Sequence, residues 1–455
     1  MRIRSDYLFF IGLFLIPFEN LFFAPSSGWA AIAPIAFFAY CIFNIKHMGL
    51  IFNKYYILFA ILGIIILISS FNYIVYAPKI SAVIDSIRSI VLGVSFLFSL
   101  YIYINIKGNS IDLLMKCLVI SYTFSLLYGV IKVIGLQFNI NFILSLMEAI
   151  EKRYYSKLAY SFTEPSYISM HIFGIILFFI IFFKQSKYTK NMKILFGCFI
   201  IFSFAFGKSV RFIIDFLIVL LIYFVSYIFL NRKHLYKFFL IGIVLIIISL
   251  TLVSVLVLSS FNLNSFLNNM ETDNDAILRL VGIFNNGIYN DGSFALRFFK
   301  ISTCIFGSLS DRFHFMTGFG LGNLNYPFQL GFYSALEKYN FPYTDGLFLW
   351  KEQLNTQIGC LPVRLLNEFG LVIAILIIVG LYKRKYLFFY LTTMWLYIQF
   401  DSYAFYTLWL YIYIISNPHT CEYNINNIVV SNKKLLLKIL SKGNVNDENR
   451  TNNLT

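Results

Sequence analysis

Charged side chains are scarce in this chain: only 13% of its 455 residues are Asp, Glu, Lys or Arg, whereas 59% are hydrophobic. A soluble protein of this length needs a charged surface to cover its core, so the composition excludes a soluble globular protein. The lipid bilayer must then be the solvent for most of the surface. We therefore predict an all-α, polytopic membrane protein.

Signals for metal sites, disulfide frameworks and signal cleavage are also missing. The six cysteines are scattered and contain no C-x-x-C pair, so they match neither a metal site nor a disulfide framework. A bridge between Cys304 and Cys360 could form if the segment that carries them faces an oxidising compartment. No small-residue cleavage site follows the first apolar run, so we expect that run to remain as a membrane anchor.

Apolar runs of about 20 residues, the length that crosses a bilayer, recur along the chain. We predict about twelve spans, at 7–23, 28–45, 55–71, 83–104, 112–136, 166–183, 194–207, 211–230, 237–260, 364–382, 386–400 and 402–416. The one long polar interruption divides the chain into spans one to nine (1–260), a large loop (261–363), spans ten to twelve (364–416) and a tail (417–455). We expect the polar tail to be partly disordered.

Lysine and arginine fall almost entirely on alternate loops, the pattern that sets membrane orientation. The basic residues of one side are Arg2, Arg4, Lys46, Lys54, Lys107, Lys184, Lys187, Lys190, Lys193, Arg232, Lys233, Lys237, Lys383, Arg384, Lys385, Lys433, Lys434, Lys438 and Lys442. This bias predicts that both termini are cytoplasmic and that the large loop lies outside. The net charge of +15 is then a topology signal and does not indicate nucleic-acid binding. The outer segment 137–165 is an exception to the bias, and its amphipathic part is expected to lie in the interface plane.

Charged side chains stand at two points where the chain enters the membrane. Glu164 precedes Pro165. An acidic residue at this position is compatible with an ordinary helix start and also with a functional site. Arg211 follows Lys208 in a very short outer turn and precedes an apolar run. An arginine at bilayer depth is a functional-site hypothesis by default, although one at a span end can also snorkel to the interface. Asp215, one helical turn further on, could pair with it.

The large loop adds further cations. Arg279, Arg297 and Arg312 are spread through the loop, and Arg364 lies where the chain re-enters the membrane. Arginine is the preferred side chain for phosphate oxygens, because its guanidinium can donate two hydrogen bonds at once. A single loop arginine, however, is usually solvated. Arg364 and Glu368 are spaced i, i+4, so a helix-surface ion pair also explains them.

A glycine-rich turn, Gly318-Phe-Gly-Leu-Gly322, lies near His314 in the same loop. Glycine permits unusual φ values and close backbone approach, which suits an anion-binding turn. The G-x-G-x-G spacing without a preceding strand excludes a dinucleotide fingerprint. A lone histidine such as His314 is more often structural than catalytic.

These pieces, in this order, resemble the O-antigen polymerase (Wzy-type) and O-antigen ligase superfamily. The matching elements are Phe162-Thr-Glu-Pro-Ser166 before a span, Arg211 in an outer turn, Arg297 and the glycine turn in one large loop, and Leu365-Leu-Asn-Glu-Phe-Gly370 running into a span. The resemblance covers most of the chain as a topology, and its motifs are short.

The resemblance implies a metal-independent glycosyltransferase of GT-C-like architecture, without a cofactor, in the bacterial inner membrane. Donor and acceptor would both be glycans on undecaprenyl pyrophosphate, joined on the periplasmic face during lipopolysaccharide synthesis, with a chain-length regulator as a partner. Arg211 and Arg297 would stabilise the departing pyrophosphate, and Glu164 or His314 would act as base. The residues expected to bind substrate are Lys208, Arg279, Arg364, Tyr167, Gly318, Gly320 and Gly322.

Other functions stay open. A ligase of the superfamily usually carries a histidine beside an asparagine late in the loop, whereas the corresponding stretch here, Leu354-Asn-Thr-Gln-Ile358, has none. This favours the polymerase over a ligase that moves the finished glycan onto lipid A–core. A flippase for the lipid-linked repeat would have charges in several spans and only short loops, but this chain has few span charges (Asp85, Arg88, Lys116 and Lys132) and one large loop. A structural assembly partner would not need the arginines.

Overall fold

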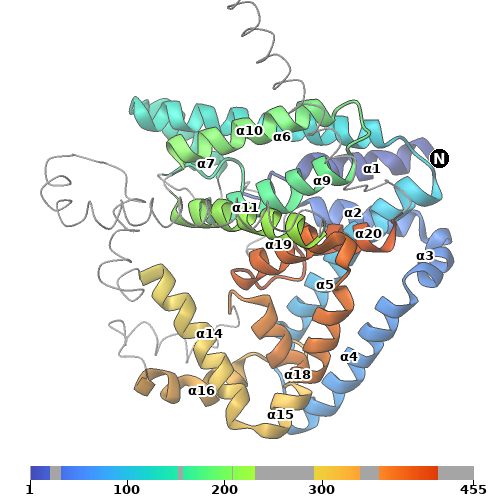
Figure 1. The fold of residues 1–455 in the computed structure, drawn as a ribbon, viewed down its shortest axis with the longest axis vertical. Coiled ribbons are helices and arrows are strands. Elements are labelled where there is room, and N and C mark those ends of the chain that lie inside the picture. Colours follow the sequence, from blue (N-terminus) through green and yellow to red (C-terminus); the bar gives the residue numbers. More distant parts are fainter. Residues whose placement is uncertain are drawn as a thin grey trace, which may run out of the picture.

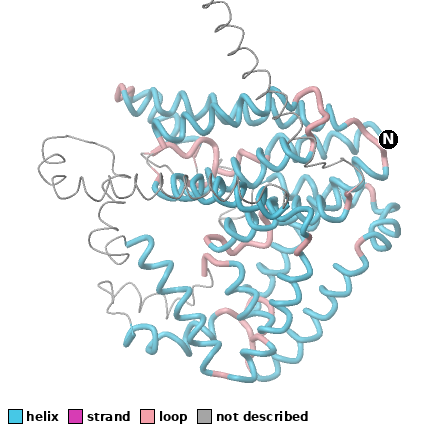
Figure 2. The backbone as a smooth tube through the Cα atoms, viewed as in Figure 1, coloured by secondary structure: helices cyan, strands magenta, loops and turns pink. Residues whose placement is uncertain are grey.

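The computed structural model describes residues 2–20, 32–151, 157–207, 209–230, 292–338 and 358–418. Within these residues every regular element is a helix, which confirms the predicted all-α class (Figures 1 and 2). The helices are α1 (Arg2–Leu15), α2 (Ile32–Phe43), η1 (Ile45–His47), α3 (Met48–Lys54), α4 (Tyr56–Val75), α5 (Ile80–Tyr101), η2 (Ile102–Ile106), α6 (Ile111–Gln137), α7 (Asn141–Ile150), η3 (Pro165–Tyr167), α8 (Ile168–His171), η4 (Ile172–Ile176), α9 (Leu177–Phe182), α10 (Thr189–Phe206), α11 (Val210–Leu230), α14 (Gly292–Ser310), α15 (Arg312–Thr317), α16 (Asn325–Lys338), α18 (Leu361–Leu381), η7 (Arg384–Tyr386), α19 (Leu387–Ile398) and α20 (Tyr406–Ser416).

Seven of the described helical segments are long and apolar enough to cross a membrane, which confirms the polytopic membrane character. They are Tyr56–Val75, Ile80–Ile106, Ile111–Gln137, Pro165–Phe182, Thr189–Phe206, Arg211–Leu230 and Leu361–Leu381. The pair Ile32–Phe43 and Ile45–Lys54, bent by 72°, could form an eighth. This count is below twelve because α1, α19 and α20 are helical but shorter, and the expected span 237–260 lies outside the described residues.

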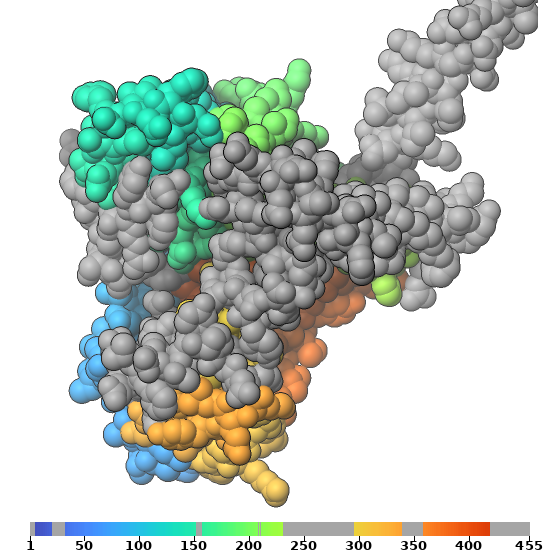
Figure 3. Space-filling view, turned by 90° about the vertical axis from the view of Figure 1, so that its left-hand side faces the viewer, coloured from blue at the N-terminus to red at the C-terminus, as the bar shows by residue number. Residues whose placement is uncertain are grey.

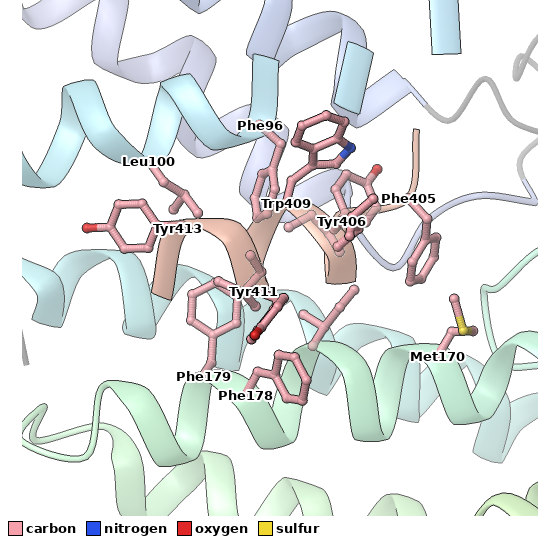
Figure 4. Packing of buried hydrophobic residues seen from close by; sticks show 14 of the residues in the cluster. Phe96, Leu100, Met170, Phe178, Phe179, Phe405, Tyr406, Trp409, Tyr411 and Tyr413 are labelled. Atoms are coloured by element: carbon pink, nitrogen blue, oxygen red, sulfur yellow. The ribbon is translucent and has the colours of Figure 1, made fainter. Parts of the chain in front are cut away.

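Helix α20 lies in the middle of the core. It is apolar on all sides and most of its residues are buried, the pattern of a helix surrounded by protein. Figure 4 shows its aromatic side chains between α5 and the α8–α9 segment. Phe96 of α5 meets Tyr406 edge to face with ring centroids 5.2 Å apart, and Phe182 meets Tyr413 at 6.1 Å. Aromatic contacts therefore supply much of the packing of α20.

The helix ends that carry the loop lysines meet at one end of the bundle. Lys107, after α5, pairs with Asp6 near the start of α1 at 2.6 Å. The Asp112 carboxylate at the start of α6 accepts a 3.1 Å hydrogen bond from the backbone N–H of Lys187, which follows α9. These contacts agree with the alternation of loops that the basic residues predict. Which side of the membrane each end faces stays a prediction.

The described part of the predicted amphipathic segment forms α7, and a buried ion pair fixes its end. Glu151, directly after α7, receives hydrogen bonds of 2.6 and 2.8 Å from Lys132 of α6 and one of 2.9 Å from the Tyr128 hydroxyl. Met147 is buried, whereas Phe142 is 78% exposed. The helix thus presents a large apolar side chain outward, and its place in the interface plane stays a prediction.

Part of the large loop forms a small helical unit with its own core. The backbones of α14 and α16 are in close contact at Gly331. A side chain at this position would overlap the Thr303 carbonyl oxygen. Their shared apolar cluster includes Cys304 and Cys360, which are buried and not bridged. Burial raises the pKa of the Cys360 thiol to about 11. The unit forms the lower end of the face in Figure 3, in yellow and orange.

Candidate active site

Two arginines from separate parts of the chain lie close enough in this structure for their charges to interact. Arg211 lies in the first turn of α11, and Arg297 lies in the second turn of α14. Arg211 interacts electrostatically with both Arg297 and Glu164. The sequence could name these three residues but could not bring them together. Two other expected members of the site, Lys208 and Arg279, lie outside the described residues.

Arg211 is held in place by a buried carboxylate. Its Nε lies 3.5 Å from Oδ2 of Asp215, so the i, i+4 pair expected from the sequence is confirmed. The other oxygen of Asp215 accepts hydrogen bonds from Trp395 Nε1 at 2.7 Å and Gln399 Nε2 at 2.9 Å, which anchor it to α19. The Arg211 side chain is only 11% exposed, and among the described residues its Nε and Nη2 have no hydrogen-bond acceptor. A buried cation with unused N–H groups is suited to an anionic ligand.

Glu164 and Tyr167 form the acidic and aromatic side of the cluster. Glu164 has an extended backbone, and Pro165 opens the helix that follows, as the sequence predicts. The Ser166 hydroxyl donates a 3.2 Å hydrogen bond to Glu164 Oε2. The buried Tyr167 ring interacts electrostatically with Glu164, Arg211 and Asp401. The helix start therefore places a carboxylate and a phenol beside the Arg211 cation.

Lys300 is a third cation of the cluster, and sequence reasoning missed it. It follows Arg297 by one helical turn on α14 and interacts with both Arg297 and Asp401. Burial lowers the pKa of Lys300; Asp401 opposes this shift and Arg297 adds to it. The i, i+3 spacing of two cations was the sequence signal that could have found it. With Lys300 the cluster holds three described cations from α11 and α14.

A buried polar network lies behind Glu164, and it too was missed. His171 Nε2 lies 3.3 Å from Glu19 Oε2, and its Nδ1 lies 3.0 Å from the Tyr122 hydroxyl. Thr163 donates a 3.0 Å hydrogen bond to the same Glu19 oxygen, and the His171 ring stacks on Phe162 at 4.0 Å. This network fixes the segment that carries Glu164. The sequence did contain signals for this network: an acidic residue inside the predicted span 7–23 and a histidine inside the predicted span 166–183. Ionisable residues within spans are rare and therefore informative.

His314 does not join this cluster. It lies beyond the far end of α14, and the rise from Arg297 to Ser310 alone is about 20 Å. Its Nδ1 lies 2.6 Å from Asp311 Oδ2, and its ring stacks on Phe319 at 4.8 Å. The ring is almost fully buried. Of the two expected bases, Glu164 is the one that interacts electrostatically with Arg211.

Asp311 gives α15 a helix cap whose strength depends on pH. Its Oδ1 accepts hydrogen bonds from the backbone N–H groups of Phe313 and His314 at 3.0 and 3.2 Å. Burial alone would raise the pKa of Asp311, but the hydrogen bonds from the His314 side chain and backbone outweigh it, so the pKa is lowered. The folded state thus binds this proton more weakly than the unfolded state. Its stabilisation is complete above the ordinary pKa and is lost as pH falls through the lowered value.

We expect Asp311→Ala to cost about 0.5–2 kcal/mol at neutral pH, because the cap is lost. Asp311→Asn keeps a capping oxygen, so it should cost less and should remove the acid-dependent part of the stability. Thermal unfolding of the purified protein, followed from pH 7 down to pH 3, measures both effects. Equal losses in the two variants, or an unchanged acid dependence in the Asn variant, would contradict this account.

The glycine turn adopts the expected backbone but uses its N–H groups within the protein. The φ angles of Gly318, Gly320 and Gly322 are +78°, +96° and +79°. The N–H of Gly320 donates to the Glu368 carbonyl at 2.9 Å, and that of Gly322 donates to Glu368 Oε1 at 3.0 Å. The N–H groups of Gly318, Phe319, Leu321 and Asn323 also have protein acceptors, which are His314 O, Asn367 O, Ser69 Oγ and Gly320 O. The hydrogen bonds to Asn367 and Glu368 connect the turn to α18, and we call this connection the joint. Anion binding by the turn stays a prediction.

Arg364 lies within the same joint. Its Nε donates to Glu368 Oε1 at 3.1 Å, which confirms the i, i+4 ion pair. Its Nη1 donates to the Asp401 carbonyl at 2.9 Å, and its Nη2 donates to Ser86 Oγ at 2.8 Å. The guanidinium also lies 4.4 Å from the centre of the Tyr403 ring. The structure thus explains Arg364 by contacts within the protein, and its expected role in substrate binding stays a prediction.

Gly318→Ala should destabilise the protein by more than about 2 kcal/mol, since positive φ alone costs a non-glycine residue about 1–3 kcal/mol. The new Cβ would also overlap the Glu368 carbonyl oxygen. Gly63 in α4 is the matched control, because no atom lies within 4 Å of a Cβ there. Gly63→Ala should change stability by less than about 1 kcal/mol. Thermal unfolding in detergent compares the two, and equal midpoints would show that the joint tolerates a side chain.

No protein-family model, curated protein or solved structure matches this chain. The resemblance to O-antigen polymerases and ligases therefore rests on the residues of the chain itself.

Proposed function

We propose that this protein is a lipid-linked glycosyltransferase of the O-antigen polymerase type, with GT-C-like architecture. It would join undecaprenyl-pyrophosphate-linked repeat units on the periplasmic face of the bacterial inner membrane, without a metal or cofactor. The observation that carries the proposal is the electrostatic interaction of the buried Arg211 with both Arg297 and Glu164. An outer loop that supplies one of these cations is expected for an enzyme and is not needed by a flippase.

The chemistry of glycosyl transfer explains why this arrangement is useful. An acceptor hydroxyl attacks the anomeric carbon of the donor glycan, and the bond from that carbon to the pyrophosphate oxygen breaks. Negative charge grows on the departing undecaprenyl pyrophosphate, and cations that are already in position stabilise it. Arg211, Arg297 and Lys300 are suited to this task. Glu164 is suited to accept the proton of the hydroxyl.

An apolar groove beside the cluster supports a polyprenyl substrate. It has a volume of about 300 Å³ and lies between η4, α9, α10, α11 and α19. On α11 its lining runs from Phe216 to Leu230, a rise of about 21 Å along the helix. Phe216 follows Asp215 directly, so the groove begins about one turn below Arg211. A lipid tail in this groove would carry its pyrophosphate close to the cations.

The test is the banding pattern of lipopolysaccharide after deletion of the gene in its host. Loss of the ladder, with lipid A–core still bearing a single repeat, is the expected result, because ligation and flipping continue. Core without any repeat would contradict the proposal. In that case long lipid-linked polymer in the periplasm would indicate a ligase, and its absence would indicate a flippase. A chain-length regulator as partner is tested by co-purification from the same host.

A further inference from the structure

Helix α4 is the least packed of the long apolar helices on its side of the bundle. Only 17% of its apolar window is buried, compared with 67% for that of α5. Hydrogen bonds hold it at both ends. At one end Asn72 Nδ2 donates to the Gly318 carbonyl at 2.7 Å, and at the other the Tyr55 hydroxyl accepts a 3.1 Å hydrogen bond from Asn417. Between these ends Ile65 is buried and the Phe59 ring lies 5.7 Å from that of Phe98 on α5, but many of the other apolar side chains are exposed.

The space beside α4 is a groove of about 340 Å³ between α4, α18 and α20. Its walls are almost wholly apolar, with Leu58 and Ile61 on α4, Leu376 and Ile377 on α18, and Ile412 on α20. A groove of this kind at membrane depth is suited to hydrocarbon. From Ile57 to Ile65 the groove follows α4 for about 12 Å. That length is close to one leaflet, about half of the 30 Å hydrocarbon core.

The groove carries positive charge at one end only. Lys54 and Lys383 both border it and are exposed: Lys54 is the last residue of α3, two residues before α4 begins, and Lys383 lies just after α18. The sequence has no Asp or Glu in 45–56 or in 371–390. No ion pair joins either lysine to another described residue. Within the described part of the chain these two cations therefore have no counter-charge, and an anionic headgroup would supply one.

We propose that this groove binds an anionic glycerophospholipid. Its phosphate lies between Lys54 and Lys383, and an acyl chain lies against α4 and α18. The polyprenyl carrier is a poorer occupant, because a carrier headgroup beside these lysines would lie at the lysine-bearing end, away from Arg211. The inference does not depend on the proposed glycosyltransferase activity, since it concerns a different groove and the opposite end of the bundle.

Native mass spectrometry of the full chain tests this, after reconstitution with equal amounts of phosphatidylglycerol and phosphatidylcholine. The wild type should retain phosphatidylglycerol in preference. The double variant Lys54→Gln/Lys383→Gln should bind it about 30-fold more weakly, at roughly fivefold per lysine near a membrane surface. Lys190→Gln/Lys193→Gln is the matched control, because these lysines are exposed on α10 and border neither groove. It should retain the lipid like the wild type.

A second variant tests the apolar part of the site. Leu376→Trp fills the groove without changing charge, so it should also lose phosphatidylglycerol, and it serves if the double lysine variant does not fold. Equal retention by the wild type and the double lysine variant would overturn the proposal. Preferential capture of added undecaprenyl phosphate over phosphatidylglycerol would also overturn it, because the groove would then belong to the carrier.

Discussion

Replacing Arg211 or Arg297 by alanine is expected to abolish the lipopolysaccharide ladder while the protein stays at its normal level in the membrane. Removing one preorganised donor from a developing negative charge lowers a rate by about 10²–10³-fold. A loss of this size leaves too little polymer for a visible ladder. Arg211→Lys keeps the charge but not the guanidinium fork, so it should retain partial activity. Gel analysis of lipopolysaccharide, with immunoblots of the membrane fraction, measures both quantities.

Two controls separate chemistry from folding. Arg312→Ala removes an exposed arginine of the same loop, outside the cluster, and should leave the ladder intact. Arg211→Ala/Asp215→Asn removes both buried charges, so it should restore any protein level lost in Arg211→Ala without restoring polymer. A normal ladder in Arg211→Ala and Arg297→Ala, at normal protein level, would refute the role assigned to these arginines.

Arg364→Ala should have the largest effect on stability. Its partner Glu368 is fully buried, and the Arg364 side chain is 12% exposed. Removing one member of a buried pair leaves an uncompensated charge and costs about 3–5 kcal/mol. That is a large part of the roughly 5–15 kcal/mol that keeps a typical protein folded. We expect little monodisperse protein by fluorescence-detected gel filtration and a marked fall in the unfolding temperature.

The neutral double variant Arg364→Met/Glu368→Gln is the control for the ion pair. Replacing both charges removes the buried uncompensated carboxylate, so it should recover a substantial part of the stability that Arg364→Ala loses. The Glu368→Gln side chain still reaches the Gly322 N–H with an oxygen. If Arg364→Ala unfolded at the wild-type temperature, the joint between the loop and α18 would not depend on this pair.

The parts of the site that were predictable from the sequence are local. Arg211 with Asp215, and Arg364 with Glu368, follow from the i, i+4 spacing of a helix. The positive φ angles of the glycine turn follow from the freedom of glycine. The all-α membrane character follows from composition and from the length of the apolar runs. Each of these depends on a few neighbouring residues.

The parts that were missed depend on packing between distant helices. Asp215 is anchored by Trp395, and Glu19 meets His171, only because α11 lies against α19 and the segment after α1 lies beside α8. No local pattern sets those relative positions. The same limit explains His314: its closeness in sequence to the glycine turn says nothing about its distance from Arg211. The count of about twelve spans stays a prediction, because α1, α19 and α20 are helical but shorter than a typical span and 237–260 lies outside the described residues.

The bond between Asn72 and the glycine turn has a consequence for biosynthesis. Asn72 lies near the end of α4, and its amide donates to the carbonyls of Thr317 and Gly318, which are 245 and 246 residues later in the chain. At about 5–20 residues per second, a ribosome needs roughly 12–50 s to add 245 residues. Throughout that interval α4 is synthesised but the acceptors of its amide do not yet exist. Insertion and docking of α4 are therefore separate events, and translation of the large loop sets the earliest time at which docking can occur.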